Sequence, residues 1–321
     1  MNIVQSITLG ATILLLCCCG NSSSEKTSST VAFPMVEPPV VMDSPVEISS
    51  YMASHYWDRF TDKSFEGVND SLRINSVLKT DLEQKFADWL YFLDGADIAT
   101  ARKAVVNFHD KVAACQRRDS LCCIYAFAKD LVRKYLYDPN SPVRNEDLYG
   151  VYAERLSKSD LIDESLKDSY AFESRMCSLN RIGEVAADFR FSDIGGHIRT
   201  MHSVKSEWTL LFFSNPGCHA CGEIIDQLKN LEFLPEMISS GYLSVINIYI
   251  DQDLDEWKSY MEIYPKEWIN CYDPDYVIRT DTLYNIRAIP SLYLLDAQKR
   301  VVLKDATPER VIMFLNNLLQ E

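Results

Sequence analysis

Basic residues are scarce in this chain relative to acidic ones. Lysine and arginine together number 32, against 46 aspartate and glutamate residues, so the formal net charge is −14 at pH 7. Nucleic-acid-binding proteins draw much of their affinity from basic patches that displace counterions from phosphates. The acidic balance therefore argues against nucleic acid as a partner.

Histidine is also scarce, with 5 residues in the chain. His55 and His109 lie in predicted helices, and neither has a second ligand at the spacing that metal sites use. We interpret both as core or surface side chains. We expect no metal and no other cofactor.

A hydrophobic run long enough for a comfortable membrane span is missing at the N-terminus. The run ITLGATILLLCCCG is short, and a short apolar segment at this position predicts a signal peptide. With the polar stretch NSSSEKTSST behind it, the run resembles the lipobox of bacterial lipoproteins. The resemblance implies a signal peptide over residues 1–19 and a lipidated cysteine at Cys18 or Cys19, with Cys17 as a further candidate.

The alternative for this segment is an uncleaved apolar helix that anchors the chain. Both a signal peptide and an uncleaved anchor imply that the protein is exported. We therefore expect it in the bacterial cell envelope, lipid-anchored to a membrane and facing the periplasm or the cell surface.

Three regions of different texture follow the N-terminal segment. Residues 20–45 are rich in Ser, Thr and Pro, which is typical of a disordered linker. Residues 46–180 repeat apolar positions at helical spacing and contain few glycines. They predict an all-α helical domain of about five or six helices without strands, one of them over residues 71–96. Residues 181–321 mix short apolar runs, a Gly-Gly turn and helical segments, which predicts an α/β domain.

The order of elements in the α/β region indicates its fold. The patterns predict a hairpin over residues 183–201, strands over 209–213, 243–251, 291–296 and 301–305, and helices after 218 and over 254–264, 280–286 and 308–320. A dithiol lies at the first strand-to-helix junction. The combination predicts a thioredoxin-like domain, with a central mixed sheet flanked by helices.

The dithiol consists of Cys218 and Cys221. An unbroken apolar run ends at Phe213, a turn follows over residues 214–217, and helical spacing begins after it. Cys218 therefore lies in the first turn of a helix, where free N–H groups and the helix dipole favour an anion. A thiol in this position becomes a thiolate more easily, and a thiolate can attack a disulfide. His219, when protonated, would favour the thiolate further.

The other cysteines lack such surroundings. Cys115 and Cys122 are too far apart for a disulfide along one helix, but the segment between them can turn, so their pairing stays open. We interpret Cys122, Cys123, Cys177 and Cys271 as small buried apolar side chains.

Three motifs make the C-terminal region similar to the TlpA/ResA branch of the thioredoxin superfamily. They are the hairpin sequence GEVAADFRFSDIGG, the CHAC motif and the segment IRAIPSLYLLD. The resemblance implies that Cys218 is the nucleophile and Cys221 the resolving thiol. It also implies that Pro290 is cis beside them, and that Ile289 offers its backbone to an extended substrate.

The chain departs from the thioredoxin pattern at one position near the dithiol. Phe212 lies where ordinary thioredoxins carry a buried acid, six residues before the first cysteine. Proton transfer to or from Cys221 then falls to water, Glu223 or Asp226. The helical region is similar, through the piece SYMASHYWDRF, to an uncharacterised helical domain found ahead of thioredoxin-like domains in bacterial envelope lipoproteins.

Together these features predict an exported thiol–disulfide oxidoreductase that exchanges protein disulfides. Its partners would be disulfide-containing exported proteins, a membrane-bound electron donor, and the membrane through a lipid anchor. The alternative is a binding or scaffold lipoprotein of the envelope whose thioredoxin-like domain is not primarily catalytic. Peroxidase chemistry is disfavoured, because Leu211 and Asn215 lie where peroxiredoxin-type sites carry other residues.

Overall fold

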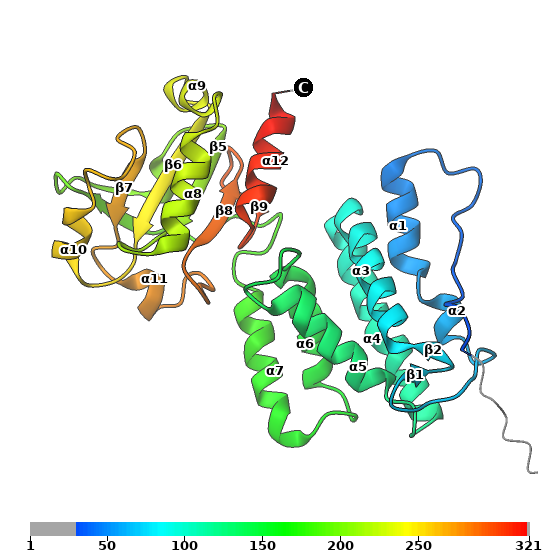
Figure 1. Ribbon diagram of the computed structural model, residues 1–321. Coiled ribbons are helices and arrows are strands. Elements are labelled where there is room, and N and C mark those ends of the chain that lie inside the picture. The colour runs from blue at the N-terminus through cyan, green and yellow to red at the C-terminus, as the bar shows by residue number, and fades with distance from the viewer. Residues whose placement is uncertain (1–29, 320–321) are drawn as a thin grey trace, which may run out of the picture.

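Helical periodicity dominates the first half of the chain, and the apolar faces of its helices meet in one core. Figure 1 shows the computed structural model, which describes residues 30–319. The helices are α1 (Pro45–His55), α2 (Asp58–Thr61), α3 (Lys79–Gly95), α4 (Ile98–Arg118), α5 (Ile124–Val132), α6 (Glu146–Ser157) and α7 (Glu164–Cys177), with a π-helical turn at Arg133–Tyr137. Aromatic rings fill much of the core, and the buried Trp89 donates its indole N–H to the carbonyl of Ala53 at 2.8 Å.

A short hairpin precedes α3, where helical spacing predicted a helix. Strands β1 (Arg73–Ile74) and β2 (Val77–Leu78) pair antiparallel. The turn residues Asn75 and Ser76 have φ values of 49° and 65°, as a two-residue hairpin turn requires. The predicted helix over residues 71–96 is therefore wrong before residue 79, because burial of Ile74 and Val77 in the hairpin overrides the helical pattern.

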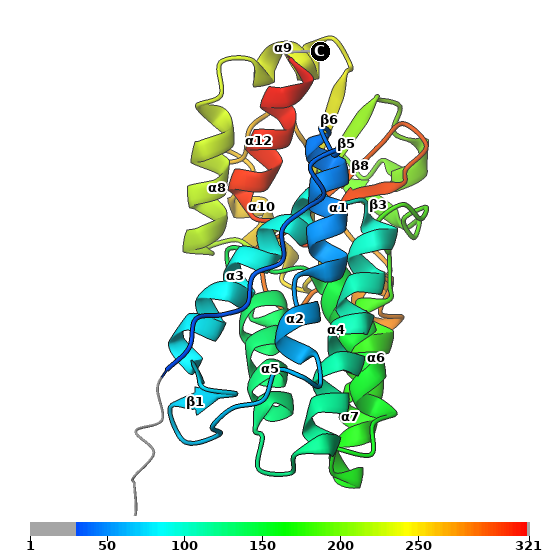
Figure 2. The same ribbon diagram turned by 90° about the vertical axis from the view of Figure 1, so that its right-hand side faces the viewer.

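The predicted linker over residues 20–45 is also wrong in part. Phe33 is buried, and its ring stacks on that of Tyr56 with centroids 5.7 Å apart. Arg59 donates a hydrogen bond to the carbonyl of Met35 at 2.7 Å. Figure 2 shows this segment running along the helices before it enters α1. A single buried aromatic side chain thus ties a Pro-rich stretch to the helical core.

The second half is built on a seven-stranded mixed sheet. Its strands are β3 (Arg190–Asp193), β4 (Ile198–Thr200), β5 (Trp208–Phe213), β6 (Leu243–Tyr249), β7 (Ile269–Tyr272), β8 (Ser291–Leu295) and β9 (Val301–Leu303), in the order β4-β3-β7-β6-β5-β8-β9. The central strands β5, β6 and β7 run parallel, and β8 pairs antiparallel with β5. The predicted mixed sheet flanked by helices is confirmed.

Alternate residues of β5 point into two different cores. Leu210 and Phe212 pack beneath helices α8 (His219–Lys229) and α12 (Pro308–Leu318). Leu211 and Phe213 pack on the opposite face, with residues that include Ile278 of α11 (Val277–Thr280). A strand covered on both faces has to be apolar throughout, which explains the unbroken run in the sequence.

Several elements of the second half were missed, misplaced or shorter than predicted. Strand β7 was not predicted, because its four residues are too few for a periodic pattern and depend on pairing with β6 and β3. The helix expected over residues 280–286 instead ends at Thr280, as α11. Helix α9 (Leu234–Ser239) was not predicted, and the helix expected over residues 254–264 ends at Ser259, as α10 (Leu254–Ser259).

Among the described residues, no helix is both long and apolar enough to cross a bilayer. The predicted signal peptide and the lipidation candidates Cys17, Cys18 and Cys19 lie outside the described residues.

Replacement of Phe33 by alanine tests whether the N-terminal segment belongs to the folded core. We expect Phe33→Ala to lower the free energy of unfolding by about 3 kcal/mol, because it removes a buried ring from an aromatic cluster. Urea denaturation followed by tryptophan fluorescence measures the change. Val40→Ala is the matched control, since Val40 is 98% exposed on the same segment. Equal stability of the two variants would contradict a structural role for Phe33.

Candidate functional site

The dithiol lies where β5 gives way to α8, as the sequence predicted. Gly217 closes the turn with a φ of 70°, a conformation that glycine adopts without strain. Cys218 is the N-cap of α8, and its Sγ accepts the backbone N–H of Cys221 at 3.2 Å. The two cysteines form a disulfide, with their Cα atoms 5.2 Å apart. The outer sulfur is therefore held at the positive end of an eleven-residue helix.

The two sulfurs differ in their access to solvent. Cys218 is half-buried at the surface, whereas Cys221 is only 2% exposed. Cys221 belongs to the same apolar cluster as Phe212 and Ile225. An incoming disulfide can therefore reach Cys218 and not Cys221, which is the asymmetry that a nucleophilic and a resolving thiol need.

Hydrogen bonds between polar side chains hold the turn that leads to Cys218. The hydroxyl of Ser214 and the side-chain oxygen of Asn247 are hydrogen-bonded in the interior, and the Asn247 amide donates to Asn270 at 2.9 Å. Asn215 donates to the carboxylate of Asp251 at 2.7 Å. These residues were not predicted as part of the site. The available signal was Asn247 itself, a polar residue between the apolar Ile246 and Ile248 of β6.

Strand register places Pro290 at the level of the dithiol turn. Ser291 is paired with Phe213, the last residue of β5, and the Ile289–Pro290 peptide bond immediately before it is cis. Ile289 and Pro290 are both half-buried. The cis bond expected from the family resemblance is confirmed. The role of Ile289 and Pro290 in substrate binding stays a prediction.

The polar residues of α8 point away from the sulfur atoms' apolar surroundings. The side chain of His219 is 86% exposed, and its Nδ1 lies 3.4 Å from a carboxylate oxygen of Glu223. Glu223 and Asp226 are both exposed, whereas Phe212 is fully buried. Phe212 therefore supplies no carboxyl group to the apolar cluster around Cys221.

The five other described cysteines are free thiols. Cys122, Cys177 and Cys271 are buried, as predicted, whereas Cys123 is half-buried. Cys115 is buried as well, and no disulfide joins it to Cys122. Burial raises the pKa of Cys122 to about 11 and raises the pKa of Cys177 far above its usual range. These thiols stay protonated and shielded at neutral pH.

The two predicted helix histidines have protein partners. His109 is buried, with one ring nitrogen 2.9 Å from the hydroxyl of Tyr125 and the other 3.0 Å from Asp110. Burial lowers its pKa. His55 is paired with Asp58 at 2.7 Å. No cluster of three or more metal-ligating side chains is found in the described part of the chain.

A buried charge cluster joins the helical half to the segment that leads to Pro290. The side chain of Glu146, at the start of α6, has no solvent exposure. One of its oxygens accepts from Arg287 at 2.5 Å and from Asn285 at 2.9 Å, and the other lies 3.5 Å from the ammonium of Lys304. All three partners belong to the second half of the chain, so α6 is held against the loop before the cis-proline.

Asp305 extends this cluster toward the site. One of its carboxylate oxygens lies 3.4 Å from a guanidinium nitrogen of Arg287 and 3.3 Å from one of Arg144. The other oxygen accepts a hydrogen bond from the hydroxyl of Ser291 at 2.9 Å. Ser291 directly follows Pro290. The two loops beside the dithiol, before β8 and after β9, are thus tied to each other and to the helical half.

The chain was compared with families and proteins of known sequence or structure. A family model described as "Domain of unknown function (DUF5106)" matches residues 19–180. A crystal structure of a thioredoxin-like protein from Bacteroides caccae is similar over 90% of this chain and 99% of that one, with 32% identity and a TM-score of 0.72. No curated protein is similar enough to match.

Structures of single domains match part of the chain. The C-terminal domain of an uncharacterized protein from Bacteroides fragilis is 44% identical and covers 43% of this chain and 98% of that one, with a TM-score of 0.41. The thioredoxin domain of a thiol-disulfide oxidoreductase from Bacteroides vulgatus is 18% identical over 43% of this chain and 97% of that one, with a TM-score of 0.37. The relative that spans both halves confirms the predicted thioredoxin-like fold.

Alkylation of the reduced protein tests the predicted difference between its thiols. We expect iodoacetamide at neutral pH to modify Cys218 first, because it is accessible and lies at a helix N-terminus. Cys177 and Cys271 should react only after denaturation, because both are buried. Peptide mass spectrometry over time measures each site. Labelling of Cys271 as fast as Cys218 in the folded protein would contradict the described burial.

Substitution of Glu146 tests the charge cluster. We expect Glu146→Gln to lower the free energy of unfolding by about 3 kcal/mol, because it leaves the buried ammonium of Lys304 without its counter-charge. The double variant Glu146→Gln/Lys304→Met should recover much of this loss. Glu154→Gln, on the exposed face of the same helix, is the control and should stay within about 0.5 kcal/mol of the wild type. A loss of similar size in both single variants would count against the cluster.

Proposed function

Because this chain belongs to the family defined by the domain of unknown function DUF5106, joined here to a thioredoxin-like half, we propose that it is an exported thiol–disulfide oxidoreductase. It would exchange protein disulfides through Cys218 and Cys221. One observation carries the proposal: an accessible sulfur at a helix N-terminus is bonded to a buried sulfur one helical turn away, beside a cis-proline.

The reaction starts from the reduced dithiol. The Cys218 thiolate attacks one sulfur of a substrate disulfide, a mixed disulfide forms, and the second substrate sulfur leaves as a thiolate and takes up a proton. Cys221 then loses its proton and attacks the Sγ of Cys218. The mixed disulfide breaks, the Cys218–Cys221 disulfide forms, and the substrate sulfur that was attacked first leaves as a thiolate and takes up a proton. The substrate gains two electrons and the protein loses two.

The surroundings of Cys221 determine which group can accept the proton that its thiol loses. Cys221 lies among apolar side chains, and Phe212 supplies no acid. Proton transfer therefore falls to water that enters when a substrate displaces the Cys218 sulfur, or to Glu223 or Asp226 through such water. Pro290 carries no N–H, so the cis-proline loop leaves the sulfurs unobstructed, and the backbone of Ile289 would bind an extended substrate.

The proposal also includes the setting of the reaction. The protein would be lipid-anchored in the bacterial cell envelope through Cys18 or Cys19, with Cys17 as a further candidate. Its substrates would be disulfide-containing exported proteins. A membrane-bound electron donor of the dithiol class would return two electrons and two protons to the Cys218–Cys221 disulfide.

An insulin-reduction assay with dithiothreitol as the electron source tests the activity. We expect turnover by the wild type, loss of turnover in Cys218→Ser, and a trapped mixed disulfide in Cys221→Ser, visible on a non-reducing gel. Cys123→Ser is the control, because this half-buried thiol lies in the helical half, and it should behave as the wild type. A wild-type protein without turnover would sink the proposal and leave a binding or scaffold role for the chain.

A further inference from the structure

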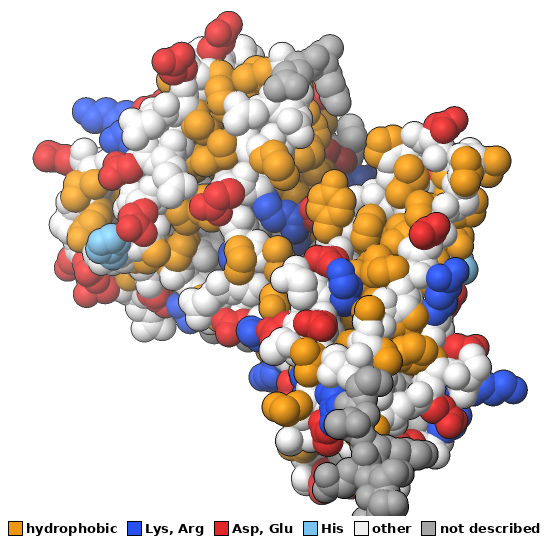
Figure 3. All heavy atoms as spheres, turned by 45° about the vertical axis from the view of Figure 1, so that its right-hand side comes forward, with side chains coloured by type: hydrophobic (Ala, Val, Ile, Leu, Met, Phe, Trp, Pro, Cys, Tyr) orange, Lys and Arg blue, Asp and Glu red, His pale blue; other side chains and the backbone are white. Residues whose placement is uncertain are grey.

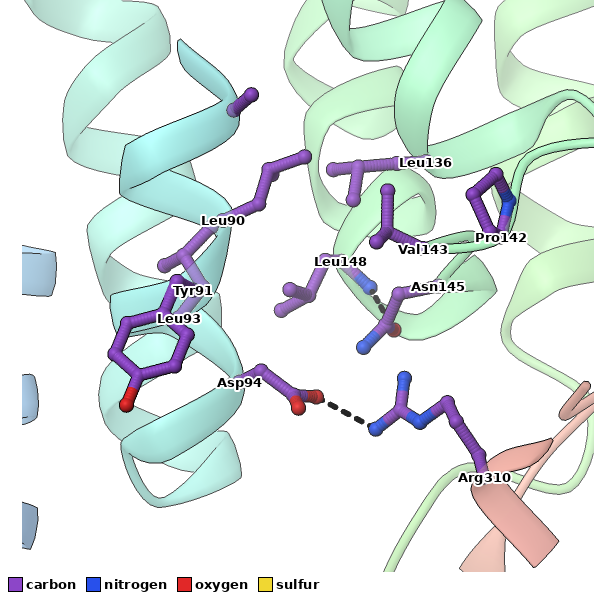
Figure 4. Close-up of a pocket in the computed structure, with 11 residues that line it drawn as sticks. Leu90, Tyr91, Leu93, Asp94, Leu136, Pro142, Val143, Asn145, Leu148 and Arg310 are labelled. Atoms are coloured by element: carbon purple, nitrogen blue, oxygen red, sulfur yellow. Dashed lines mark hydrogen bonds and ion pairs between the residues drawn. The ribbon is translucent and has the colours of Figure 1, made fainter. Parts of the chain in front are cut away.

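A pocket lies between the two halves, bordered by α3, by the segment that enters α6 and by the start of α12. We call it the α3–α12 pocket, and Figure 4 shows it in close-up. Its volume is about 260 Å³. Apolar side chains make up much of its lining, and the polar Asp94, Asn145 and Arg310 border it at one end; the apolar residues that matter here are Leu90, Leu136, Val143 and Leu148. In Figure 3, hydrophobic side chains gather along the recess between the halves.

The polar end of the pocket offers donors that lack acceptors. Asn145 uses its side-chain oxygen to cap α6 by accepting the N–H of Leu148 at 3.1 Å, which turns its amide nitrogen toward the cavity (Figure 4). One guanidinium nitrogen of Arg310 donates a hydrogen bond to the carboxylate of Asp94 at 2.6 Å. Among the described residues, the Asn145 amide nitrogen and the remaining guanidinium nitrogens of Arg310 have no acceptor in the protein. An occupant of the pocket would therefore have to bring a hydrogen-bond acceptor together with an apolar group.

The size of the pocket sets a second requirement. Sites for complete small molecules occupy roughly 300–1,000 Å³, so this pocket lies just below that range. It fits one large aliphatic side chain better than a cofactor. A polypeptide meets both requirements, since each apolar side chain is flanked by backbone carbonyl oxygens that accept hydrogen bonds.

A continuous set of contacts connects the pocket to the cis-proline. Arg144, between two pocket residues, donates to the Asp305 carboxylate at 3.3 Å and to the carbonyl of Ala306 at 3.2 Å. On the other side of this loop, Asp305 accepts from Ser291 at 2.9 Å, and Ser291 follows Pro290. One buried loop thus separates the pocket from the segment where an extended substrate would bind.

We propose that the α3–α12 pocket is a second substrate subsite, which binds an aliphatic side chain of a disulfide-containing polypeptide some residues away from the reacting cystine. The backbone carbonyl beside that side chain accepts hydrogen bonds from Arg310 and Asn145. The subsite rests on the proposed function and adds to it a substrate class: proteins with an aliphatic residue near the disulfide. It also makes the helical half a contributor to substrate recognition.

Peptide kinetics test the subsite in the full chain. A series of cystine-bridged peptides carries one leucine, moved through successive positions on either side of the cystine, with serine elsewhere. We expect one position at which leucine raises kcat/KM on the order of tenfold over serine. Glutathione disulfide, which is too small to reach the pocket from the dithiol, serves as the probe of the basic exchange reaction.

A substitution that fills the pocket should abolish the leucine preference alone. Ala87→Phe places a ring among the lining residues from the surface of α3. It should bring the leucine peptide down to the rate of the serine peptide and leave the rate with glutathione disulfide unchanged. Ala126→Phe is the matched control, because Ala126 is exposed on α5 outside the pocket. A leucine preference that survives in Ala87→Phe, or that is absent from the wild type, would overturn the subsite.

A second pair of variants separates recognition from structure at the polar end. Arg310→Met and Asp94→Asn both break the ion pair between Arg310 and Asp94. Arg310→Met also removes the guanidinium donors that would bind the substrate carbonyl, whereas Asp94→Asn keeps them. Loss of the leucine preference in Arg310→Met but not in Asp94→Asn is the expected result, and equal loss in both would overturn the proposed hydrogen bond from Arg310 to the substrate. If exchange with glutathione disulfide is absent from the wild type, the proposed function itself fails. Binding of octanoate by the wild type without any leucine preference would assign the pocket to a small amphiphile and overturn the proposal.

Discussion

The burial of one carboxylate constrains the whole arrangement of this protein. Glu146 lies at the start of a helix with no solvent exposure, and an ion in such a place is stable only when paired and hydrogen-bonded. Its counter-charges, Arg287 and Lys304, both come from the other half of the chain. Neither half can move away without leaving charges unpaired in the interior. The loop that ends at the cis-proline is therefore fixed by a residue of the helical half.

This arrangement makes the helical domain a physical support for the loops beside the dithiol. The dithiol turn is positioned by buried strands, which the thioredoxin-like half supplies alone. The loops beside it are positioned differently. Arg287 lies with its guanidinium 4.2 Å from the ring centroid of Tyr137, and that ring stacks on Tyr149 at 4.0 Å. An aromatic stack of the helical half thus supports the segment that precedes Pro290.

Sequence patterns predict this site as far as local interactions determine it. An apolar run that stops at Phe213, a turn and a dithiol could be recognised because strand burial and helix capping act within a few residues. The charge cluster could not, since Glu146 looks like any acid in the first turn of a helix. Its partners lie about 140 residues away, and no spacing rule connects them. The same holds for Asp94 and Arg310, and for β7, whose four residues need neighbouring strands to become a strand.

The free cysteines fit the same division between local and long-range effects. A buried thiol is shielded from oxidants and from other thiols. Cys115, Cys122, Cys177 and Cys271 are shielded in this way, and their burial also raises their pKa values. Cys218 differs because the N-terminus of α8 brings its sulfur to the surface and favours its thiolate. Packing thus shields these four thiols, whereas the geometry of α8 leaves a different sulfur, that of Cys218, accessible beside its disulfide partner Cys221.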